Sequence, residues 1–243
     1  MWKRVPILAA LASFAFAASA LAQAPATFPA NPDVEYEQSI ITIPIYAGTK
    51  EPVEILKLTA WMRLVREAPT RNGLGHRQLE FTIADWELYG YSEFLKADVT
   101  FKLSNVPIQP KSLAVSLVES QDYPAIIVYN AIYDIYIGQK RVAMNRPGVA
   151  FAKNVYEIPP RNISVAFSKP FSLSGSFPLN ASAAAVIAKN TAADPTASRS
   201  EVVLFADGTC EDMVQTTKEE YEAGVAIGKA IRAGTMTLAQ SAR

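Results

Sequence analysis

Apolar and polar residues alternate along most of the chain between residues 34 and 178, which is the pattern of β-strands with one buried and one solvated face. The clearest run covers residues 56–64, and shorter runs lie at Ile41–Ile45, Leu79–Ile83, Val99–Leu103, Leu113–Leu117 and Ile163–Phe167. Turn-forming residues separate the runs. These features predict a mainly β fold over residues 34–178, an antiparallel β-sandwich of the Ig-like or jelly-roll-like kind.

Two local features interrupt this alternation. The pair Asn72-Gly73 separates two runs and predicts a hairpin turn, because both residue types tolerate positive φ angles. After Asp85 the phase of the alternation changes, so that Trp86 and Leu88 are apolar. An extra residue in the strand shifts the phase in this way, so we predict a β-bulge near residues 84–86.

The C-terminal part of the chain has a different composition. Residues 179–199 are rich in Ala, Ser and Thr and predict a linker, with an Ala-rich helix over Ala181–Lys189 as the alternative. Residues 200–234 predict a short strand followed by an α-helix, and residues 235–243 form a tail.

The predicted C-terminal helix has recognisable ends. Thr217 and Glu220 have the spacing of a capping box, and Gly234 is a typical residue after a last turn. One face of the helix carries apolar and small residues, namely Tyr221, Val225, Gly228 and Ile231. Gly224 and Gly228 would allow this face to approach a neighbouring element closely.

The first 22 residues have the pattern of a secretory signal peptide. Lys3 and Arg4 precede an Ala- and Leu-rich stretch, which ends in small residues around Ala22. We expect cleavage after about Ala22, an extended leader over residues 23–33, and a periplasmic or secreted protein. The rest of the chain holds no second apolar run long enough to span a bilayer, so we expect no membrane span after cleavage.

Composition excludes several classes of function. The 23 basic and 23 acidic residues cancel, so no strong basic field favours nucleic acid as a partner. With one His and one Cys, the chain lacks the ligands of the usual zinc sites and cannot form an internal disulfide. We expect no metal and no cofactor.

Three residues are candidates for catalysis. Asp85 and Glu87 lie two apart on a predicted strand, so their carboxyl groups share one face at about 6–7 Å. This is close to the spacing of the acid pairs in glycoside hydrolases. His76 is the only imidazole, but Glu80 is about 13 Å away on the same strand, too far to orient it. No convergent catalytic set emerges, and a non-enzymatic role is favoured.

The aromatic residues Trp61, Trp86 and Tyr89 are candidates for ligand binding, because exposed aromatic rings stack on sugars. Trp61 falls on the polar face of its strand. Trp61 is either exposed, where a sugar could stack on its ring, or buried beneath the C-terminal helix. The second interpretation is favoured because that helix needs an apolar surface to pack against.

Cys210 lies in the acidic segment Asp207–Asp212, where nearby carboxylates oppose formation of a thiolate. We interpret the segment as a solvated acidic turn, since it lacks the spacing of a calcium loop. In an oxidising compartment, Cys210 is either a buried thiol or the site of an intermolecular disulfide in a homodimer.

One short motif resembles those of other proteins. Tyr123-Pro124-Ala125, followed by the strand Ala131–Ile137, is similar to a pattern in an uncharacterised family of bacterial exported β-sandwich proteins. The resemblance covers about 15 residues. It implies export and a sandwich fold, and it assigns no activity and no site residue.

Two functions follow as expectations. The first is an exported, non-catalytic module with a binding, structural or assembly role at the cell envelope, where its partner is a protein or a glycan. The alternative is a carbohydrate-binding or weakly glycan-hydrolysing protein that uses Trp61 or Trp86 with Asp85 and Glu87.

Overall fold

A computed structural model describes residues 27–49, 51–160, 163–165, 171–172, 180–193, 202–204 and 208–238. The expected fold class is confirmed, because the chain is mainly β, with antiparallel strands and a C-terminal α-helix. The predicted signal peptide, residues 1–22, lies outside the described residues.

The described strands are joined by hydrogen bonds into one sheet, and all their pairings are antiparallel. In chain order they are β1 (Asp33–Ala47), β2 (Glu54–Arg66), β3 (Thr70–Arg71), β4 (His76–Ser92), β5 (Ala97–Leu103), β6 (Lys111–Glu119), β7 (Ala125–Ile137), β8 (Lys140–Val155), β9 (Ile163–Val165), β10 (Phe171–Ser172), β11 (Val202–Leu204) and β12 (Gly208–Gln215). The helices are α1 (Ala181–Ala193) and α2 (Lys218–Ala233).

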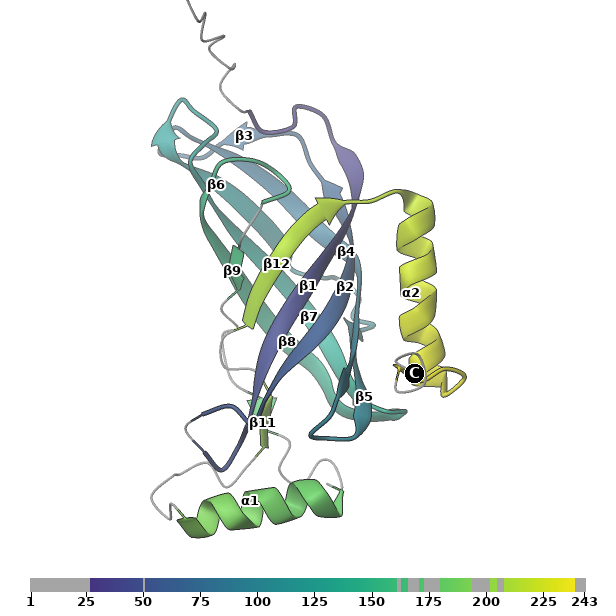
Figure 1. The fold of residues 1–243 in the computed structure, drawn as a ribbon. Helices are drawn as coiled ribbons and strands as arrows, with labels where there is room; N and C mark the ends of the chain where they lie inside the picture. Colours follow the sequence, from purple (N-terminus) through teal and green to yellow (C-terminus); the bar gives the residue numbers. More distant parts are fainter. Residues whose placement is uncertain are drawn as a thin grey trace, which may run out of the picture.

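The order of the strands places long strands around the core. β12 pairs with β1, which pairs with β2, and β2 pairs with β4. β6 and β5 lie one after the other between β4 and β7, and β8 pairs with the far edge of β7. Figure 1 shows that this sheet is strongly twisted and curved.

Because of this curvature, parts of the sheet that are not hydrogen-bonded to each other face one another across one apolar core. Tyr129 of β7 donates a hydrogen bond to the sulfur of Met213 in β12 at 3.7 Å. Trp86 of β4 packs edge-on against Tyr133 of β7, with 5.7 Å between ring centroids. Strand β7 thus faces β12 and β4 across the core, as one layer of a sandwich faces the other.

The predicted bulge is present in β4. Arg63 of β2 pairs with Asp85, whereas Leu64 pairs with Ile83, so Ala84 is the extra residue. Trp86 therefore turns towards the core and Asp85 turns towards the outer face. The single inserted residue decides which side chains of β4 lie on each face of the sheet.

Helix α2 begins and ends where the sequence predicts. Thr217 accepts a hydrogen bond from the backbone N–H of Glu220, whose side chain accepts one from the backbone of Thr217. Gly234 ends the helix with a φ of 71°, a left-handed conformation that glycine adopts without strain. Figure 1 shows α2 standing against the outer face of the sheet beside β2 and β4.

The linker expected over residues 179–199 differs from the structure, which has helix α1 in this segment. Asn180 caps the helix by accepting a hydrogen bond from the backbone N–H of Ala183 at 2.8 Å. The side chain of Asn190 donates to the carbonyl of Ala47 at 2.9 Å, which ties the helix to the end of β1. Alanine's high helix propensity and these two tertiary contacts favour a helix over a linker.

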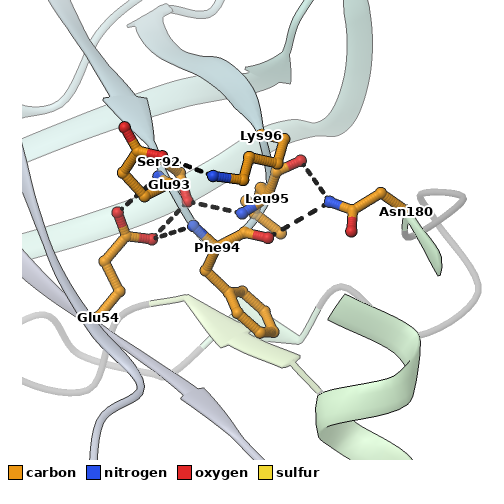
Figure 2. Close-up of polar contacts among 7 residues, drawn as sticks. All are labelled: Glu54, Ser92, Glu93, Phe94, Leu95, Lys96 and Asn180. Atoms are coloured by element: carbon orange, nitrogen blue, oxygen red, sulfur yellow. Dashed lines mark hydrogen bonds and ion pairs between the residues drawn. The ribbon is translucent and has the colours of Figure 1, made fainter. Parts of the chain in front are cut away.

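The turn between β4 and β5 is held by a polar network, which Figure 2 shows. The carboxylate of Glu54 accepts hydrogen bonds from the hydroxyl of Ser92 at 2.5 Å and from the backbone N–H groups of Glu93 and Phe94. Asn180 donates to the carbonyl groups of Phe94 and Leu95, so the same turn also anchors the start of α1.

Glu54→Ala should destabilise the protein by about 2–3 kcal/mol, because it leaves the buried hydroxyl of Ser92 and two turn N–H groups without their charged acceptor. Urea denaturation measures this change. Glu93→Ala is the control, because its exposed ion pair with Lys96 is screened by solvent and should add little to stability. Equal losses in both variants would contradict the assigned role of Glu54.

Candidate functional site

The inner face of the sheet encloses an apolar cavity of about 60 Å³. This volume is several times the roughly 10–15 Å³ that one water molecule needs. It is well below the roughly 300–1,000 Å³ of pockets that hold drug-sized molecules. Residues of β1, β2, β4, β7, β8 and β12 line the cavity, among them Ile41, Met62, Ile83, Trp86, Ala131 and Met213.

Strand β1 brings a carboxyl group into this cavity. Glu37 and Ser39 continue the inward face that Ile41 begins, and all three line the cavity. Glu37 is 2% exposed, and its Oε2 atom has no hydrogen-bond partner among the described residues.

The surroundings of Glu37 oppose its ionisation. The pKa of Glu37 is raised from 4.5 to about 8, first by burial and then by the negative charge of Glu35, whereas the positive charge of Arg66 lowers it. At neutral pH the side chain is therefore mainly a neutral acid. A buried carboxyl group with a raised pKa in an apolar cavity is a typical mark of a functional site.

The core beside Glu37 is closed by an ion pair and by the N-terminal segment. Arg66 contacts Glu35 at 2.9 Å, and both side chains are 6% exposed. Arg66 also donates to the backbone carbonyls of Pro29 and Asn31, at 3.4 and 3.0 Å. Phe28, from the same segment, is 2% exposed and is therefore part of the core.

The opposite wall lies between two strand edges. Gly148, Val149 and Ala150 of β8 line the cavity, as do Cys210 and Met213 of β12. In the described part of the chain, β8 pairs only with β7, and β12 pairs only with β1 and β9. β9 pairs with the Gly208–Cys210 end of β12 and lies beside β8, whereas among the described strands no hydrogen bonds join β8 to β12 directly.

The two candidate carboxylates lie on the outer face of the sheet, against helix α2. Asp85 accepts a hydrogen bond from the hydroxyl of Tyr221 at 2.6 Å. Glu87 is 2% exposed and forms a two-pronged ion pair with Arg232, one bond of which measures 2.9 Å. Gly228 covers Glu87 so closely that a Cβ atom at this position would overlap the carboxylate. Both carboxylates thus fasten the helix to the sheet.

The three candidate aromatic residues are divided between the two faces. Trp61 lies under Gly224 of α2, where a Cβ atom would overlap the indole ring, and its Nε1 donates to the hydroxyl of Tyr89 at 3.0 Å. Tyr89 is 7% exposed, and its burial raises the pKa of its hydroxyl group. Trp86 lies on the inner face and lines the cavity.

The remaining candidates, His76 and Cys210, lie apart from this carboxylate pair. His76 begins β4, nine residues before Asp85, which is about 30 Å along a strand. Cys210 lies on the inner face of β12, lines the cavity and is 4% exposed. A disulfide with a second chain would need this thiol to leave the core.

The sequence reasoning missed Glu37, although the sequence contains a signal for it. Ile41, Ile43 and Ile45 mark the buried face of the first strand, and counting backwards in steps of two places Glu37 on that face. A charged residue at a core-facing position of a strand is unusual. A charged side chain on the buried face of the first strand is therefore the sequence signal that points to Glu37.

No described helix is long and apolar enough to cross a membrane. No protein-family model matches the chain, and no curated protein matches it. Among solved structures, DynF from the dynemicin biosynthesis pathway of Micromonospora chersina is similar, at 12% sequence identity and a TM-score of 0.47. The alignment covers 79% of this chain and 85% of DynF. A similarity at this level carries no functional argument.

Proposed function

We propose that this protein is an exported binding module that holds a small apolar molecule in the cavity inside its sheet. The observation that carries the proposal is the apolar cavity itself, with Glu37 as its one ionisable carboxyl group among the described lining residues. Concave apolar sites with few polar groups are the usual form of small-molecule sites in proteins. Export is the expectation from the N-terminal sequence.

The alternative, a glycan ligand on the outer face, receives less support from the geometry. Trp61 and Tyr89 lie beneath or beside α2, and Asp85 and Glu87 are bonded to residues of the same helix. A sugar could stack on Trp61 or reach the carboxylates only after α2 had left the sheet. The inner cavity requires no such rearrangement.

Methionine methyl groups report directly on the cavity. Met62 and Met213 line it, whereas Met144 and Met236 are 55% and 38% exposed. Xenon is an apolar probe small enough for this cavity. Titration of the chain, labelled with ¹³C in the methionine methyl groups, with xenon should therefore shift the NMR signals of Met62 and Met213. The signals of Met144 and Met236 serve as controls within the same spectrum and should stay in place.

A substitution that fills the cavity tests the same proposal. Ala131→Leu adds bulk at a lining position and should weaken xenon binding at least tenfold, because it occupies the space of the ligand. Ala223→Leu makes the same change on the exposed face of α2 and should leave binding unchanged. Xenon that shifts none of the four signals, or shifts all four equally, would overturn the proposed function.

A further inference from the structure

The unusual feature of the cavity is that its carboxyl group lacks a partner. Glu37 is buried with one oxygen atom unbonded among the described residues, although nearly all buried polar atoms in proteins form hydrogen bonds. Leaving a buried acceptor unsatisfied costs stability. A buried carboxyl group with an unbonded oxygen atom at a cavity wall is suited to bind a polar group of a ligand.

The charged neighbour of Glu37 is already engaged. Arg66 is bonded to Glu35 at 2.9 Å and to two backbone carbonyls of the N-terminal segment. The charges of Glu35 and Arg66 therefore offset each other. If Glu37 ionises, this cluster carries one net negative charge in an apolar cavity.

We propose that the cavity selects small apolar amines, whose ammonium group forms a charge-assisted hydrogen bond with the carboxylate of Glu37 while the apolar part fills the space beside Met62, Trp86 and Ala131. This inference rests on the proposed function and names the chemical class of its ligand. A monocation completes the charge balance of the cluster, whereas an anionic ligand would face Glu35 and Glu37 together.

The ligand is small and carries a single polar group. A volume of about 60 Å³ suits one compact apolar group and leaves no room for a large molecule. Ser39 is adjacent to Glu37 on the inward face of β1 and provides a second acceptor for an ammonium proton. The other described lining groups near Glu37 are mainly apolar.

Binding of an ammonium ion moves one proton. Glu37 is protonated in the empty cavity at neutral pH, so it gives its proton to solvent as the ammonium ion enters and the ion pair forms. Affinity for an amine should therefore rise as pH increases from 6 to 8. The groups that face Glu37 are Glu35 on its own strand, Arg66 of β2, Tyr129 of β7 and Cys210 of β12.

The direct test compares ethylamine with ethanol, which has nearly the same shape but carries no charge, and both are small enough for a cavity of about 60 Å³. Calorimetric titration at pH 8 should give a dissociation constant for ethylamine at least tenfold lower. Glu37→Gln should abolish this preference and leave ethanol binding within about threefold of wild type, because the amide cannot form an ion pair. Glu51→Gln, an exposed acid changed in the same way, should keep the preference.

Proton release provides a second measurement that needs no variant. Titration at pH 6.5 in two buffers of different ionisation enthalpy should show nearly one proton released per ethylamine bound. Cys210→Ser should release the same amount, which separates Glu37 from the thiol that also lines the cavity.

The outcomes distinguish this inference from the proposed function. If ethanol and xenon bind but ethylamine gains no preference, the cavity is a ligand site and the amine inference is wrong. Ethylamine affinity that falls as pH rises from 6 to 8 would likewise overturn it. If none of the three molecules binds, the proposed function itself is wrong.

Discussion

Replacing Glu37 by Gln should stabilise the protein at pH 8 far more than at pH 4.5. We expect the free energy of unfolding of Glu37→Gln, relative to wild type, to increase by roughly 4 kcal/mol over this range, since one pKa unit corresponds to about 1.4 kcal/mol. The effect is large because the folded protein raises the pKa of this single group from 4.5 to about 8.

The direction of the change follows from proton binding. Between pH 4.5 and 8 the folded protein keeps the Glu37 proton, whereas the unfolded chain loses it. The folded state therefore loses stability relative to the unfolded state as pH rises through this window. Glutamine does not titrate, so the variant lacks this loss.

Urea denaturation of wild type and variant at pH 4.5, 6.5 and 8 measures the difference, and the other acids of the protein cancel in it. Glu51→Gln is the matched control, because the exposed side chain at position 51 should give a constant difference across the three pH values. Parallel pH profiles for wild type and Glu37→Gln would show that the cavity does not perturb this carboxyl group.

Arg232→Met should destabilise the protein by roughly 3–5 kcal/mol at pH 8, because it leaves the carboxylate of Glu87 buried without its counter-ion. The carboxylate is 2% exposed and is covered by Gly228, so water cannot easily replace the guanidinium group. Burial already raises the pKa of Glu87 despite the lowering by Arg232. The loss should therefore shrink at acidic pH, where Glu87 becomes protonated.

Urea denaturation at pH 8 and pH 5, together with limited proteolysis of α2, measures this effect. The double variant Arg232→Met/Glu87→Leu should recover most of the lost stability, because no buried charge remains. Lys229→Met removes an exposed cation from the same helix and should change stability by less than about 1 kcal/mol. A double variant as unstable as the single one would contradict this explanation.

Local patterns were sufficient for much of the fold. The period of two assigned most of the long strands, the change of phase placed a bulge near residues 84–86, and Thr217 with Glu220 located the start of α2. Each of these features depends on residues close together in the chain, so single-sequence reasoning can identify it. The Ala-rich segment was ambiguous because its helix α1 is supported by distant contacts, such as that of Asn190 with Ala47.

The acidic segment near Cys210 shows what local patterns could not provide. Its residues from Gly208 onward form β12, where the sequence favours a solvated turn. The strand forms because it pairs with the edge of β1, about 170 residues earlier in the chain. In this pairing Ile41 lies opposite Cys210. Such long-range pairing leaves no periodic signal in a short acidic segment.

The division between the inner and outer sites has the same origin. The alternation of β1 already placed Glu37 on the buried face, and the spacing of Asp85 and Glu87 already placed them on one face of β4. Only the tertiary structure decided that α2 covers these two acids while the curved sheet closes a cavity around Glu37. Periodicity specifies the face on which a side chain lies, but what covers that face depends on contacts between distant parts of the chain.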